Sequence, residues 1–104
     1  MFTFRDFYIP ERMMGGIERW VLYGIKPGDF LTAVLSNDLL AACQQADDEN
    51  LRNIPAYIAY LYDTVPAECW GSKDKMTAWQ NKLNPTEEPK SDGWYMAHGV
   101  ENED

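Results

Sequence analysis

The chain has 104 residues, of which 45% are hydrophobic and 13% aromatic, and it carries a formal net charge of −8. This length and aromatic content predict a single folded domain with a modest core and argue against disorder over most of the chain. The negative charge opposes direct nucleic-acid binding, and no stretch reaches the roughly 20 apolar residues of a membrane span.

The charge is unevenly placed along the chain. Residues 1–84 hold eight basic and eleven acidic residues, a net charge of −3, whereas residues 85–104 hold one basic and six acidic residues, a net charge of −5. We therefore predict a helical domain over residues 1–84 and an acidic tail over residues 85–104 that is partly ordered or flexible. The apolar triplet Trp94-Tyr95-Met96 within the tail is expected to dock onto the domain or to act as a linear motif for a partner, and docking is favoured.

The segment 1–9 alternates loosely, with Phe2 and Phe4 in phase and Phe7 out of phase. It predicts a short strand or an extended arm. Because no second strand-like run is visible, no pairing partner is expected within the chain. A second subunit could supply one, or the aromatic side chains could pack on the helices.

A first helix is predicted over residues 10–24. Pro10 and Glu11 suit the start of a helix, and Gly24 suits its end. Apolar residues follow helical spacing at Met13, Ile17, Trp20 and Val21. The pair Gly15-Gly16 costs roughly 1 kcal/mol per residue relative to Ala, which suggests close approach of another backbone or a ligand, or local bending.

A second helix is predicted over residues 29–46. Its apolar stripe includes Val34 and Ala42, and Asp38 falls inside that stripe at 100° per residue. A buried carboxylate needs a partner, for which Arg12 and Arg19 are the first candidates and Arg52 the third. A structural ion pair or a water-filled groove between helices is the favoured interpretation, and a binding site is the alternative. Asn37 could belong to either.

A third helix is predicted over residues 47–64, capped by Asp47 and kinked or restarted at Pro55. Its expected core-facing side is made of Leu51, Ile54, Ile58, Leu61 and Tyr62. Tyr57, Tyr60 and Tyr62 spread around this helix, so not all three can be buried, and an exposed tyrosine favours an interface. A fourth helix is predicted over residues 72–83, capped by Ser72.

These elements predict an all-α fold, a compact bundle of about four helices with an extended N-terminal arm and an acidic C-terminal tail. Four short helices bury a limited core, so a homodimer formed through exposed aromatic side chains is plausible.

The residue inventory disfavours catalysis. The only histidine, His98, lies in the tail, and Cys43 and Cys69 are expected to be buried thiols in a reducing cytoplasm. No Cys/His cluster has metal-ligand spacing, and no glycine-rich phosphate loop follows a strand. We therefore predict no enzymatic activity, no catalytic residue, no metal and no cofactor.

Three segments of the chain carry a family resemblance. They read IPERMMGGIERWVLYGIKPGDFLTAVLSNDLLAA, ADDENLRNIPAYIAYLYDTVP and CWGSKDKMTAW. Together they resemble a family of small proteins encoded by phages and prophages, over roughly residues 9–79. The resemblance carries over no activity and no functional residue. It implies a phage accessory protein acting in the bacterial cytoplasm.

Three functions are compatible with this sequence. The first is a non-enzymatic inhibitor that binds a host protein, such as a component of a bacterial defence system. The second is a sponge for a nucleotide signal, which would need cations for phosphate and an aromatic face for the base. The third is an assembly protein of the virion or the replication machinery. The candidate binding residues are Arg12, Arg19, Trp20, Lys26, Asn37, Asp38, Tyr57 and Trp70.

Overall fold

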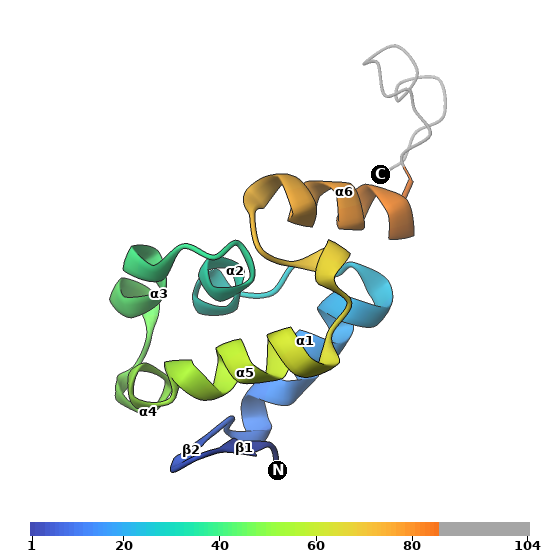
Figure 1. Cartoon of the computed structure of the whole chain (residues 1–104). Helices are drawn as coiled ribbons and strands as arrows, with labels where there is room; N and C mark the ends of the chain where they lie inside the picture. The colour runs from blue at the N-terminus through green and yellow to red at the C-terminus, as the bar shows by residue number, and fades with distance from the viewer. Residues whose placement is uncertain (86–104) are drawn as a thin grey trace.

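The computed structural model describes residues 1–85, which form six α-helices, one short 3₁₀ helix and a two-stranded sheet (Figure 1). The predicted helical body is confirmed, and the small sheet is an addition to the all-α class. The expectations for Trp94-Tyr95-Met96 and His98 fall outside the described residues.

The N-terminal segment is a β-hairpin rather than an unpaired arm. Strands β1 (Thr3–Phe4) and β2 (Phe7–Tyr8) are antiparallel, and Phe4 lies opposite Phe7. Between them Arg5 adopts a positive φ of 55°. The expectation that the segment has no pairing partner within the chain was wrong. The tight turn places Phe7 out of phase with Phe2 and Phe4, so the second strand does not continue their alternation. The hairpin packs on helix α5 (Ile54–Thr64), where the rings of Phe2 and Tyr60 meet edge to face at 5.1 Å.

Helix α1 (Glu11–Tyr23) agrees with the prediction to within one residue at each end. It ends at Gly24, whose φ of 68° lies in the left-handed region and whose N–H donates to the carbonyl of Trp20 at 2.9 Å. A Cβ at this position would lie 2.8 Å from Nδ2 of Asn84. Gly24 is therefore needed both for its backbone conformation and for the close approach of the chain after the last helix.

The predicted helix over residues 29–46 is two helices, α2 (Asp29–Leu35) and α3 (Leu39–Gln45). Asn37 breaks the run because it takes a left-handed φ of 62°. Asp38 then caps α3, accepting a hydrogen bond from the N–H of Ala41 at 3.1 Å. The expectation of a buried Asp38 paired with an arginine was wrong, because Asp38 is exposed to solvent. As the N-cap it precedes the helix, so a rotation of 100° per residue does not give the direction of its side chain.

The predicted helix over residues 47–64 is likewise divided, into α4 (Asp48–Arg52) and α5 (Ile54–Thr64), with Pro55 in the first turn of α5. The cap at Asp47 is confirmed, since its side chain accepts from the N–H of Asn50 at 2.8 Å. The restart at Pro55 is confirmed as well. The expected apolar face is only partly buried, and Ile58 and Tyr62 are 39% and 80% exposed.

The core is centred on Trp20. Its indole N–H donates to the carbonyl of Cys69 at 2.9 Å, and the indole N–H of Trp79 donates to the carbonyl of Trp20 at 3.2 Å. These bonds hold α1 against the 3₁₀ helix η1 (Ala67–Cys69) and helix α6 (Lys73–Leu83). In Figure 1, α6 lies across one end of the molecule, and α1 runs behind α5. The largest fully buried side chains are Trp20, Tyr57, Ile9, Ile17, Leu35, Leu61 and Cys69.

The Gly15-Gly16 pair lies close to one side chain of α2 and to one side chain of α1 itself. A Cβ on Gly16 would lie 3.0 Å from Cδ1 of Leu31 on α2, and a Cβ on Gly15 would lie 3.1 Å from Nη1 of Arg19. Close approach at this pair was expected from a backbone or a ligand. In the structure it comes from two side chains.

Candidate functional site

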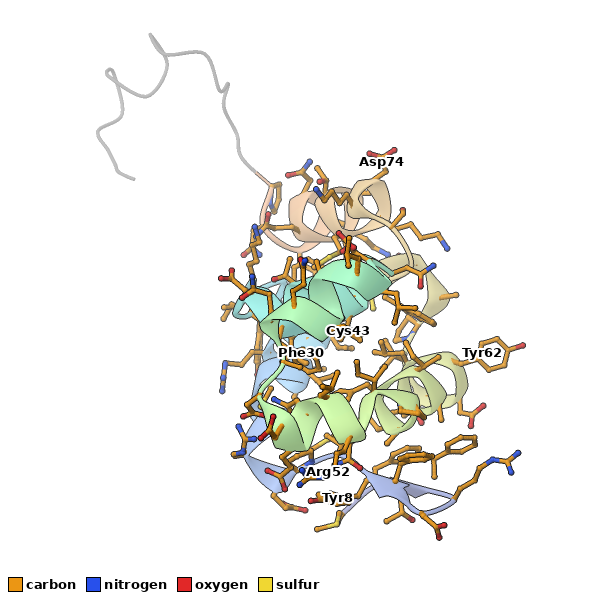
Figure 2. All side chains as sticks on the ribbon, turned by 90° about the vertical axis from the view of Figure 1, so that its left-hand side faces the viewer. Tyr8, Phe30, Cys43, Arg52, Tyr62 and Asp74 are labelled. Carbon is orange, nitrogen blue, oxygen red and sulfur yellow. The ribbon has the colours of Figure 1, made fainter. Side chains whose placement is uncertain are left out.

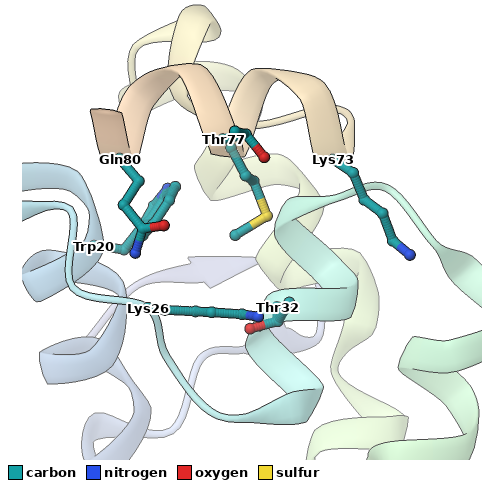
Figure 3. Close-up of a pocket in the computed structure, with 7 residues that line it drawn as sticks. Trp20, Lys26, Thr32, Lys73, Thr77 and Gln80 are labelled. Atoms are coloured by element: carbon teal, nitrogen blue, oxygen red, sulfur yellow. The ribbon is translucent and has the colours of Figure 1, made fainter. Parts of the chain in front are cut away.

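Helix α6 covers a hollow of about 250 Å3 that also borders α1 and α2, called here the α6 hollow (Figure 3). Figure 3 shows Lys26 extending along its floor toward Thr32, and Lys73 at the far end of α6 with its side chain directed outward, away from Lys26. Both lysines are exposed to solvent. The described lining consists of Trp20, Lys26, Thr32, Lys73, Met76, Thr77 and Gln80, with no acidic residue among them.

Lys26 also borders a second hollow of about 320 Å3, called here the α1 hollow, on the side of α1 that carries Arg12 and Arg19. The structure therefore brings three predicted site residues, Arg12, Arg19 and Lys26, to one place. The described lining of this hollow also holds no acidic residue. The rest of its lining consists of Met13, Gly16, Ile25, Pro27, Gly28 and Leu31.

Trp20 borders the α6 hollow but is only 1% exposed. Its indole N–H is already bonded to Cys69, and little of its ring is open to a ligand. Trp20 therefore offers no open aromatic face on which a nucleotide base could stack. Trp70 is half-buried against the core and lines none of the three hollows described in this subsection.

Arg12 belongs to an ion-pair network that joins α1 to the start of α4. It lies 3.0 Å from Asp47 and 3.1 Å from Glu49, and the hydroxyl of Tyr8 donates to Glu49 at 2.6 Å. The pKa of Glu49 is held below its usual value, first by the Tyr8 hydroxyl and then by Arg12. The pKa of Asp47 is lowered first by the backbone N–H of Asn50 and then by Arg12. Two carboxylates thus share the charge of Arg12.

Tyr57 lies in the core and not at a surface site. It is fully buried, its hydroxyl donates to Oδ1 of Asn50 at 2.6 Å, and Asn50 is buried as well. Burial raises the pKa of Tyr57 far above its usual value, so the phenol remains a neutral donor. Nearby, Asn53 accepts from the N–H of Tyr8 and donates to the carbonyl of Glu49, both at 2.9 Å. This layer tethers the hairpin to the α4–α5 junction.

Asn37 and Asp38 border a small hollow of about 30 Å3 between α2, α3 and α5. Leu39, Ile54 and Ile58 line the same hollow. Leu39 is 66% exposed, and Tyr62 follows Ile58 by one helical turn. Figure 2 shows the side chain of Tyr62 pointing away from the body. Leu39, Ile54, Ile58 and Tyr62 together are called the α3–α5 face.

The two cysteines differ in their surroundings. Cys69 is buried as expected, and burial raises its pKa to about 11, which keeps the thiol protonated and unreactive at neutral pH. Cys43 is exposed, contrary to expectation, because it lies on the outer side of the short helix α3. Within residues 1–85, no group of three or more His, Cys, Asp or Glu side chains is arranged to hold a metal ion.

Reasoning from the sequence missed Lys73, Thr77 and Gln80 as lining residues. They come together with Lys26 only because α6 folds back over the end of α1, where the amides of Asn84 and Gln80 donate to the carbonyls of Tyr23 and Gly24. No local sequence pattern predicts that α6 folds back over the end of α1. Ile54, Ile58 and Tyr62 of the α3–α5 face were expected to face the core, since their spacing is the one expected of a buried helix.

Comparison of the chain with protein-family models, with curated proteins and with solved structures found no match. Among the helices of residues 1–85, none has the length and apolar character that crossing a bilayer requires.

Proposed function

We propose that this is a non-enzymatic phage accessory protein that binds and inhibits a host protein, such as a defence-system component, in the bacterial cytoplasm. The observation that carries the proposal is the α3–α5 face. Its apolar side chains have the spacing of a core-facing helix, and yet Tyr62 is 80% and Leu39 66% exposed. Grouped apolar side chains left open to water are characteristic of interaction surfaces.

The composition of this face suits a protein partner. Tyr62 is an amphipathic aromatic residue with few rotatable bonds, the kind of anchor that carries much of the binding energy at interfaces. Leu39 and Ile58 flank a shallow hollow that a partner's apolar side chain could enter. The exposed carboxylates of Asp38 and Asp63 lie beside these residues in the chain and favour a basic rim on the partner.

The resemblance to phage-encoded proteins supplies the biological setting of the proposal. The net charge of −8 would speed encounter with a positively charged host surface. A compact binder of this kind acts by occupying a surface of its target. It therefore needs no nucleophile, general base or metal ion, which agrees with the sequence-based expectation that the protein is not an enzyme.

The proposal is tested by affinity capture from bacterial lysate with matched surface variants. Ile58→Asp places a charge on the α3–α5 face, and Leu22→Asp places the same charge on exposed α1, where Leu22 is 62% exposed. We expect the unmodified protein and Leu22→Asp to recover one stoichiometric host protein, and Ile58→Asp to lose it. Thermal midpoints of both variants show that they are folded. Recovery of nothing above background, or equal recovery by both variants, would refute the proposal.

A further inference from the structure

The two larger hollows concentrate positive charge on a protein that is acidic as a whole. Lys26 borders both, Lys73 borders one, and Arg12 and Arg19 border the other. Arg12 is already paired with Asp47 and Glu49. Within residues 1–85, Lys26, Lys73 and Arg19 form no ion pair, so these three cations depart from the average of residues 1–84, whose net charge is −3. This local field favours an anion at the α6 hollow.

The cations of the α6 hollow are not neutralised by neighbours. Within residues 1–85, ion pairs form at Arg12 and Lys82 but at neither Lys26 nor Lys73. Asp74 follows Lys73 in the chain, but Figure 2 shows its carboxylate pointing away from the body. Two ammonium groups thus border one hollow without a described counter-charge.

The remaining lining restricts what the anion can be. Thr32 already donates its hydroxyl to the carbonyl of Pro27 at 3.1 Å, whereas no described hydrogen bond engages the exposed hydroxyl of Thr77. Met76 and the edge of Trp20 supply apolar walls but no stacking face. A volume of about 250 Å3 is below the usual range for drug-sized ligands. The hollow suits a compact anion with more than one charged group rather than an aromatic nucleotide.

From this geometry we infer that the α6 hollow is a binding site for a small multivalent anion, a phosphorylated or polycarboxylate molecule held by Lys26 and Lys73 and hydrogen-bonded by Thr77. This site is independent of the α3–α5 face and of the host-protein interaction proposed above. Two lysines can each meet a separate anionic group, which a single surface lysine cannot do.

The inference is tested by titrating the full chain with inorganic pyrophosphate, and separately with citrate, at constant physiological ionic strength while recording amide NMR spectra. We expect saturable shifts confined to residues 25–32 and 73–80 for at least one probe. The probe that binds more tightly shows whether the site prefers phosphate or carboxylate groups.

Matched variants separate a site from general charge attraction. Lys26→Met and Lys73→Met each remove one cation from the hollow. Lys82→Met removes the same charge elsewhere on α6, where Lys82 pairs with Glu68 at 2.7 Å. We expect at least tenfold weaker binding in the first two variants and less than a twofold change in the third, with amide spectra showing all three folded. Shifts that fail to saturate with either probe, or equal losses in all three variants, would overturn the inference.

Discussion

At the scale of single residues, Tyr57 shows how one hydroxyl can support a core. Its O–H reaches the buried side-chain oxygen of Asn50 at 2.6 Å. Tyr57→Phe would leave that oxygen buried without its donor, which costs about 1–3 kcal/mol. We expect chemical denaturation to show a loss of stability of this size.

Tyr62→Phe is the matched control for that substitution. Tyr62 is exposed, so its hydroxyl can bond to water in both the folded and the unfolded chain. We expect a change within about 0.5 kcal/mol. Equal losses in the two variants would show that the bond between Tyr57 and Asn50 contributes nothing measurable.

Glu49 gives a second residue-scale prediction, concerning pH. Its pKa is lowered in the folded protein below the usual value of 4.5, first by Tyr8 and then by Arg12. A lowered carboxylate pKa stabilises the fold above the ordinary pKa, and this stabilisation is lost as the pH falls through the folded value. We expect Glu49→Gln to lower the thermal midpoint at pH 7, and the difference from the unmodified protein to shrink progressively below about pH 4. A difference that stays constant from pH 7 to pH 3 would contradict this account of Glu49.

At the scale of elements, the end of α1 depends on Gly24. Any L-residue there must adopt a φ of 68°, at a cost of about 1–2 kcal/mol, and its Cβ would meet Asn84 at 2.8 Å. We therefore expect Gly24→Ala to destabilise the protein by at least this amount. Gly28 is the matched control, because its φ is −69° and a Cβ there would meet nothing within 4 Å. Gly28→Ala should cost less than about 1 kcal/mol, and an equal loss in both variants would contradict the role assigned to Gly24.

The elements also show what the sequence could and could not predict. The caps at Asp47 and Ser72 and the stop at Gly24 were predicted correctly, because each depends on contacts within a few residues. The break at Asn37 was missed because the apolar spacing continues across it, so periodicity outweighed the turn chemistry of Ser36-Asn37-Asp38. The hairpin was missed because its turn interrupts the alternation of apolar residues between Phe4 and Phe7, which pair across the two strands.

The sequence anticipated part of the geometry around the candidate site residues. Arg12, Arg19 and Lys26 do lie together, since α1 and the segment after it are close in the chain. Lys73 was not foreseen, because its place beside Lys26 depends on the path of α6 across the molecule. The α5 residues of the α3–α5 face were misread as core, since apolar spacing reports which side of a helix is apolar but not whether anything in the same chain covers it.

At the scale of the whole molecule, the structure separates two surfaces of different chemistry. The α3–α5 face is apolar and carries an exposed tyrosine, whereas the α6 and α1 hollows are lined by cations. The α6 hollow lies near the end of α1, and the α1 hollow follows α1 from Arg12 to Arg19. The proposed binding of a host protein depends on the first surface, and the inferred binding of a small anion depends on the second. Loss of either activity by substitution should leave the other intact.

The central claim is that the protein acts by binding a host protein through the α3–α5 face. The most direct test is the dissociation constant for the captured host protein, measured by calorimetry with Tyr62→Ala and with Tyr23→Ala, which truncates another exposed tyrosine, 59% accessible, on α1. We predict at least tenfold weaker binding for Tyr62→Ala, as expected of an aromatic anchor, and less than a twofold change for Tyr23→Ala. Equal affinities for the two variants, or a larger loss with Tyr23→Ala, would contradict the claim.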